Sequence, residues 1–110
     1  MKDLNIVLEI DDTTVNYIEG VHGKVSIEYD DGTPFQGNVT FAIQYELTKS
    51  FTTGYEHEIN GETTYHVPRN AIVSGLGRYS IRLHEIYDSE NKRVADNNDL
   101  KTYYLLFDVI

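Results

Sequence analysis

Histidines, acidic pairs and serines are the side chains in this sequence that could carry chemistry. The four histidines, His22, His57, His66 and His84, fall on four different predicted strands. A metal site needs ligands that converge, and no H-x-H or H-x-x-x-H spacing places two histidines together on one element. We therefore expect these histidines on sheet faces or at the surface, and the sequence predicts no metal site.

Acidic side chains gather in three predicted turns, where they could offer oxygen ligands to calcium. Two groups are the adjacent pairs at 11–12 and 30–31, and the third comprises Asp88, Asp96 and Asp99. Calcium takes about six to eight oxygen ligands, and the third group lacks the glycine and the closing glutamate of an EF-hand. Solvated turn residues are the stronger interpretation, and no cofactor is expected.

The sequence contains none of the common catalytic motifs. Its serines stand outside any G-x-S-x-G elbow, and the stretch S-G-L-G at 74–77 is followed by neither a helix pattern nor a lysine. There is no cysteine, which excludes disulfides and thiol nucleophiles. The sequence therefore predicts a protein that is not an enzyme.

Phe51 and Tyr55 are the candidate binding residues. They lie in K-S-F-T-T-G-Y, at 49–55, which interrupts the strand pattern. Exposed aromatic rings can stack on sugars or anchor a protein partner. Packing in the core or at a sheet edge is the stronger interpretation for both residues.

The charge of the chain excludes two classes of partner. Eighteen acidic side chains stand against nine basic ones, giving a formal net charge of -9. Nucleic acids and anionic membranes both need clustered Lys and Arg. No apolar run approaches the roughly 18 residues of a membrane helix, so direct membrane insertion is not expected either.

Alternation of apolar and polar residues dominates the chain and predicts strands. At 110 residues the chain is one domain by size. Turn signals recur every ~8 to 12 residues, as they do in β-sandwiches. We expect seven or eight strands and no helix, with the clearest alternation at 4–10, 21–29, 39–45, 55–59, 62–67, 78–86 and 103–109.

A hairpin is predicted around the dipeptide N-G in the middle of the chain. A three-residue loop ending in a left-handed Gly61 is preferred, because it puts Tyr55 and Tyr65 on one face. This register sets Glu58 opposite Glu62, at a cost of a few tenths of a kcal/mol. A two-residue loop would put the two tyrosines on opposite faces.

The stretch L-G-R-Y-S-I, at 76–81, resembles the tyrosine corner of immunoglobulin-like (Ig-like) sandwiches. In those domains a tyrosine hydroxyl near the start of the sixth strand bonds to the backbone just upstream, and a core residue follows two positions later. Tyr79 would be the corner residue and Ile81 the core residue. An ordinary strand tyrosine is the alternative.

Nearly all of the chain resembles Ig-like repeats of large bacterial and archaeal cell-surface, adhesin-like proteins. The resemblance implies an all-β, Ig-like Greek-key β-sandwich of seven or eight antiparallel strands, with residues 1–110 as one domain of a larger chain. Macroglobulin-type domains of thioester proteins share some of these sequence features and are the second family that the chain resembles. Residues 47–54 and the connection after Tyr87 depart from the short repeats and are expected insertions, where such domains place function. The stretches that carry the resemblance are DDTTVNYIEGVHGKVSIEYDDGTPFQGNVTFAI, INGETTYHV, GLGRYSIRLHEIYD and TYYLLFDV.

The resemblance implies a non-enzymatic module of a cell-surface protein that acts as a spacer or in adhesion. Its expected partners are the neighbouring domains of the same chain, and a surface protein or glycan. The module would be extracellular, with its signal and anchor outside these 110 residues. One alternative is a carbohydrate- or protein-binding accessory module that uses Phe51 and Tyr55. Another is an Ig-like decoration domain of a phage or other virion.

Overall fold

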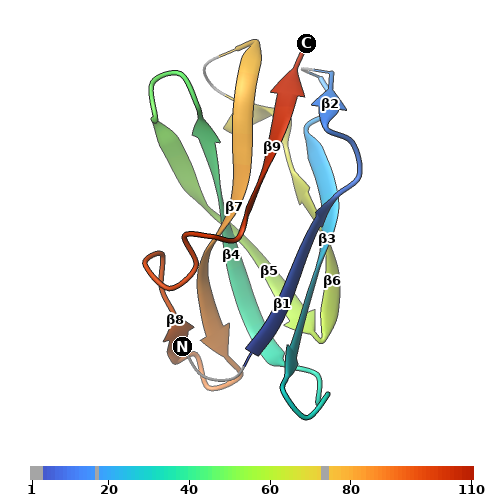
Figure 1. Cartoon of the computed structure of the whole chain (residues 1–110), viewed down its shortest axis with the longest axis vertical. Coiled ribbons are helices and arrows are strands. Elements are labelled where there is room, and N and C mark those ends of the chain that lie inside the picture. The colour runs from blue at the N-terminus through green and yellow to red at the C-terminus, as the bar shows by residue number, and fades with distance from the viewer. Residues whose placement is uncertain (1–3, 17, 73–74) are drawn as a thin grey trace.

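The computed structural model describes residues 4–16, 18–72 and 75–110, and its fold is all-β with strands of mixed orientation (Figure 1). The seven expected strands are confirmed; three of them, β4, β5 and β7, extend beyond the predicted ends. Two short strands, β2 and β8, were not expected. The described part of the chain holds no helix with the length and apolar character of a membrane span. The elements are β1 (Leu4–Ile10), β2 (Thr14–Val15), β3 (Val21–Tyr29), β4 (Gln36–Tyr45), β5 (Phe51–Asn60), β6 (Glu62–Val67), the 3-10 turn η1 (Arg69–Ala71), β7 (Gly77–Asp88), β8 (Arg93–Ala95) and β9 (Tyr104–Val109).

The strands pair in the order β1-β3-β6-β5-β4-β7-β9-β2, with β8 beside β7. Within β1-β3-β6 and within β5-β4-β7-β9 the neighbours form antiparallel ladders of six or more residue pairs. In the described part of the chain, β5 and β6 pair only at Asn60 and Glu62, so the order divides there into two groups. β2 pairs with β9 in parallel.

The predicted hairpin register is wrong, although its turn residue is confirmed. Gly61 is left-handed, with φ of 79°. Beyond the first pair the strands diverge, because β5 pairs along its length with β4 and β6 with β3. Glu58 consequently lies opposite Asn38, and the expected repulsion between Glu58 and Glu62 does not arise. Glu62 instead forms an ion pair with Lys24, with 3.4 Å between Nζ and Oε1.

Buried side chains from both strand groups form a single core cluster. The expected alternation holds at the start of β7, where Tyr79, Ile81 and Leu83 are buried. Farther along, a β-bulge passes over His84 in the pairing with β4, so Ile86 takes the next buried position. The largest fully buried side chains are Tyr65, Tyr79, Phe35, Phe41, Phe107, Ile27, Ile43, Ile72, Ile81, Leu83, Ile86 and Leu100.

Tyr79 makes the expected hydrogen bond to the backbone just upstream. Its hydroxyl donates to the carbonyl of Gly75 at 2.6 Å, and the residue is almost fully buried. The ring also stacks on Phe107, with centroids 5.7 Å apart. The hydroxyl therefore fixes the chain at the entrance to β7 while the ring packs in the core.

Replacement of Tyr79 by phenylalanine should lower the free energy of unfolding by about 1 kcal/mol. The substitution keeps the ring but leaves the carbonyl of Gly75 without this donor. Urea unfolding followed by circular dichroism would measure the loss. Tyr104→Phe is the matched control, because Tyr104 is 43% exposed. Equal stability of the two variants would show that the Tyr79 hydroxyl stabilises nothing.

Candidate functional site

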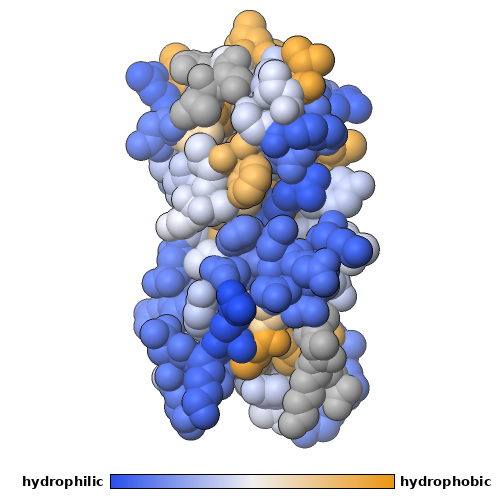
Figure 2. All heavy atoms as spheres, turned by 90° about the vertical axis from the view of Figure 1, so that its left-hand side faces the viewer, coloured by the Kyte–Doolittle hydropathy of each residue, from blue (hydrophilic) through white to orange (hydrophobic). Residues whose placement is uncertain are grey.

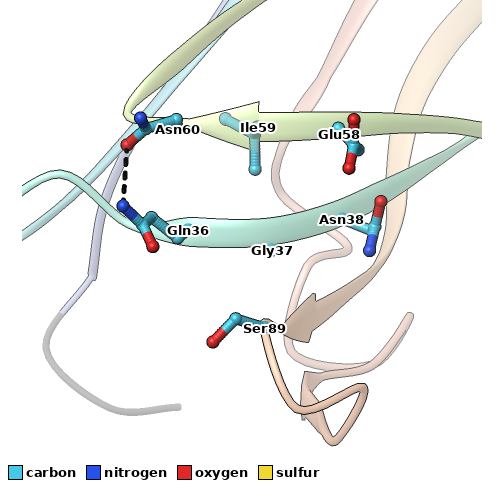
Figure 3. Close-up of a pocket in the computed structure, with 7 residues that line it drawn as sticks. All are labelled: Gln36, Gly37, Asn38, Glu58, Ile59, Asn60 and Ser89. Carbon is cyan, nitrogen blue, oxygen red and sulfur yellow. Dashed lines mark hydrogen bonds between the residues drawn. The ribbon is translucent and has the colours of Figure 1, made fainter.

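A polar groove lies at the end of the molecule where β4 begins and β5 ends (Figure 3). Its volume is about 510 Å³. Ligand sites in proteins usually occupy about 300–1,000 Å³, so the groove has room for a small molecule. We call it the polar groove; it is lined by Gln36, Gly37, Asn38, Glu58, Ile59, Asn60 and Ser89.

Two cross-strand pairs supply most of the polar groups of the groove. Gln36 lies opposite Asn60, and Asn38 lies opposite Glu58. Successive side chains of a strand point to opposite faces, so these four share one face, whereas Ile59 is buried on the other. Gln36 Nε2 donates to Asn60 Oδ1 at 3.4 Å (Figure 3). The register of β4 against β5 therefore creates the site.

Gly37 allows the turn after β7 to reach the groove. A Cβ atom at this position would overlap the backbone carbonyl of Tyr87 and crowd the ring of Phe35. With no side chain there, the backbones approach closely and Ser89 lines the groove. The carboxylate of Asp88 holds the turn itself, by accepting two backbone N–H groups from within it, each at 2.9 Å.

An aromatic ring stands beside the groove. A second hollow, of about 380 Å³, shares Gln36 and Ser89 with the polar groove. Tyr29 lines this hollow and is 38% exposed. Its ring is supported by Phe35, with centroids 5.8 Å apart and an angle of 56° between the rings. The remaining lining residues of the second hollow are Thr33, Pro34 and Asp88.

The surroundings of the groove are negative. Glu58 lies in it, Asp88 lines the adjoining hollow, and among the described residues no lysine or arginine lines either one. The nearby turn between β3 and β4 adds Asp31, whose pKa is lowered by hydrogen bonds from the hydroxyl and the backbone N–H of Thr33. Carboxyl groups at these positions disfavour the approach of anions to the groove.

Phe51 and Tyr55 lie outside the groove, and the structure separates them. Phe51 is opposite Gln44 on the outer face of the β5-β4-β7-β9 group and is 56% exposed. Tyr55 is opposite Phe41 and is half-buried against the core. A bulge at Gly54, with φ of 100°, reverses the faces between them. A glycine inside a strand pattern is the signal for such a bulge.

The segment 47–54, expected to be an insertion, belongs in part to a strand, because β5 begins at Phe51. A polar network occupies the same outer face. Ser80 Oγ donates to Glu46 Oε2 at 3.0 Å, and Arg82 Nε donates to Ser80 Oγ at 3.0 Å. Burial raises the pKa of Glu46, but hydrogen bonds from Lys49 and Ser80 and two nearby positive charges outweigh it and lower the pKa.

The polar groove and the network around Glu46 differ in how many of their polar side chains have hydrogen-bond partners. The groups around Glu46 bind one another, whereas the described residues offer no hydrogen-bond partner to the side chains of Asn38, Glu58 and Ser89. These three side chains in the polar groove remain open to a ligand. Sequence reasoning missed them because each is an ordinary polar residue until the register of β4 and β5 is known.

Three of the four histidines converge, which the sequence did not indicate. His22, His57 and His66 line a cleft of about 460 Å³. His22 and His66 are opposite each other in the β3–β6 ladder, with rings stacked at 4.2 Å and 9°. Because the imidazole rings of His22 and His66 are stacked, their nitrogen lone pairs do not point at one common position. The described residues contain no group of three histidine or acidic side chains that could hold a metal ion.

No protein family and no curated protein matches the chain, but solved structures share its fold. The Pseudomonas fluorescens alkylpurine DNA glycosylase AlkC, bound to DNA containing an abasic site analog, matches 100% of this chain with a TM-score of 0.55 and 14% identity. A mutant β-glucosidase from Listeria innocua in complex with laminaribiose matches 97% with a TM-score of 0.58 and 12% identity. The β-glucosidase from Listeria innocua in complex with isofagomine matches 96% of this chain, with a TM-score of 0.56 and 13% identity.

This chain spans only a part of each of these proteins. The match covers 31% of the glycosylase chain and 16% of either glucosidase chain. At such low identity the likeness concerns the fold alone.

Proposed function

We propose that the chain is a non-enzymatic Ig-like module of a larger surface protein, where it acts as a spacer or in adhesion. We further propose that its two strand groups form an Ig-like Greek-key β-sandwich. The division of the strand order between β5 and β6, the single core cluster and the hydrogen bond of Tyr79 support this fold.

The observation that supports the spacer role is that β1 begins and β9 ends at opposite ends of the molecule. β1 begins in the lower part of Figure 1, and β9 ends at the top. The molecule measures 41 × 23 × 20 Å, with the strands running along its length. Modules joined through such ends would follow one another in a row, and each would add its long dimension to the distance spanned.

Exposed aliphatic side chains at the upper end favour a neighbouring domain as partner. They come from four segments that meet there, because the start of β7 pairs with the end of β9 and with the end of β4, and β2 pairs with β9. In Figure 2, apolar side chains are more frequent towards this end than over the lower half. Apolar groups clustered at a surface mark contact sites. The four residues are Ile18, Leu47, Leu76 and Ile110, which are 62% to 81% exposed.

The solved structures support membership of a larger chain. In the glycosylase and the glucosidase this fold makes up less than a third of the protein. Each of those proteins carries the module together with a larger remainder. A module of the same fold in this protein would likewise accompany further domains.

The size of the native polypeptide tests the proposal. An antibody raised against this domain, applied to fractionated source cells, should detect a band far above 12.6 kDa in the envelope fraction. A band near 12.6 kDa in the soluble fraction would overturn both the surface location and the spacer role.

A further inference from the structure

We propose that the polar groove binds an uncharged carbohydrate. The inference rests on the proposed function, because it gives the adhesion module the chemical class of its ligand. It concerns the surface around Asn38 and Glu58 and not the aromatic residues of the outer face.

The hydrogen-bonding groups of the groove suit hydroxyls. Each amide of Gln36, Asn38 and Asn60 offers both a donor and an acceptor, and the Glu58 carboxylate offers acceptors. A hydroxyl group donates and accepts at once, so it can use both kinds of partner. An ammonium group only donates and a phosphate mainly accepts, so each would leave part of this set unused. A molecule rich in hydroxyls satisfies it most completely.

The charge of the groove selects against acidic sugars. The carboxylate of Glu58 lies among the amides, that of Asp88 lies in the adjoining hollow, and no basic residue in the described part of the chain lines either hollow. A uronate or a sulfate would be placed beside these carboxylates without a positive charge to balance it. The hydroxyl-rich ligand is therefore neutral.

Tyr29 offers the apolar contact that a sugar ring needs. Its partly exposed ring lines the hollow that continues from the polar groove past Gln36 and Ser89. Aromatic rings pack against flat apolar surfaces and keep a polar edge in water, and one face of a pyranose ring presents only C–H groups. A chain of two or more sugar units could place hydroxyls on the amides and one ring on Tyr29.

A glycan array probed with the 110-residue protein tests the inference, followed by calorimetric titration with the best neutral oligosaccharide. Asn38→Ala and Tyr29→Ala should each weaken binding about tenfold or more. Phe51→Ala is the control, and it should bind as the unaltered protein does. Ser89→Ala gives a second groove variant if Asn38→Ala unfolds, which a urea titration would show.

The outcomes separate this inference from the proposed function. Binding of neutral glycans that depends on Asn38 and Tyr29 supports it. Absence of any neutral ligand, preference for sulfated or uronic glycans, or a loss confined to Phe51→Ala would each overturn it. None of these results changes the size of the native polypeptide, which tests the spacer role separately.

Discussion

Replacing Ile81 with alanine should lower the free energy of unfolding by about 2 to 5 kcal/mol. Ile81 is fully buried in the middle of β7, opposite Ile43 in β4 and Leu105 in β9. The substitution removes three buried carbon atoms between two ladders that cannot close the gap without shifting both partners. The lost hydrophobic transfer energy and the cavity add to each other.

Urea unfolding of the variant, followed by circular dichroism, measures this effect. Leu106→Ala is the matched control, because Leu106 lies on the neighbouring strand β9 and is 41% exposed. The control should lose much less than Ile81→Ala. A loss below about 0.5 kcal/mol for Ile81→Ala would contradict the assigned inward face of β7.

Replacing Gly23 with alanine should cost about 2 to 4 kcal/mol, because of overpacking and a lost hydrogen bond. A Cβ atom there would overlap the carbonyl of Glu9 and the phenol of Tyr65. The Tyr65 hydroxyl reaches past Gly23 and donates to that carbonyl at 2.6 Å. Burial, and then the charges of Asp11 and Glu9, raise the pKa of Tyr65, so its hydroxyl stays protonated and remains a donor.

A double-mutant cycle identifies the cause of this loss. In the Tyr65→Ala background the phenol is absent, so the added methyl group at Gly23 should cost clearly less than in the unaltered protein. Gly23 is not among the glycines with positive φ, so left-handed backbone strain does not contribute to this loss. Identical costs of Gly23→Ala in both backgrounds would disprove the proposed clash with Tyr65.

The strands could be predicted because alternation is a local property of the sequence. β3 and β6 match their expected bounds fully, since each begins and ends at a turn signal. β2 and β8 have two and three residues, too few to show any period. The pairing of β6 with β3 rather than β5 joins residues far apart in the chain, and local patterns do not encode such contacts.

The candidate site could not be predicted from the sequence, for the same reason. Asn38 and Glu58 are 20 positions apart and meet only through the β4–β5 register. A polar side chain at every second position, in Q-G-N at 36–38 and in E-I-N at 58–60, is the signal that the sequence offered. The bulge at Gly54 then moved Phe51 and Tyr55, the residues expected to bind, onto opposite faces.

The parallel contact between β2 and β9 has a mechanical consequence. Asp108 N–H donates to the carbonyl of Thr13 at 2.8 Å, and Ile110 N–H donates to that of Val15 at 3.0 Å. The chain approaches β2 from the lower end of Figure 1 and leaves β9 at the upper end. A pull on both ends therefore slides the two strands past each other and loads both bonds together, instead of opening them one by one. The shortest strand of the molecule thus resists its extension under force.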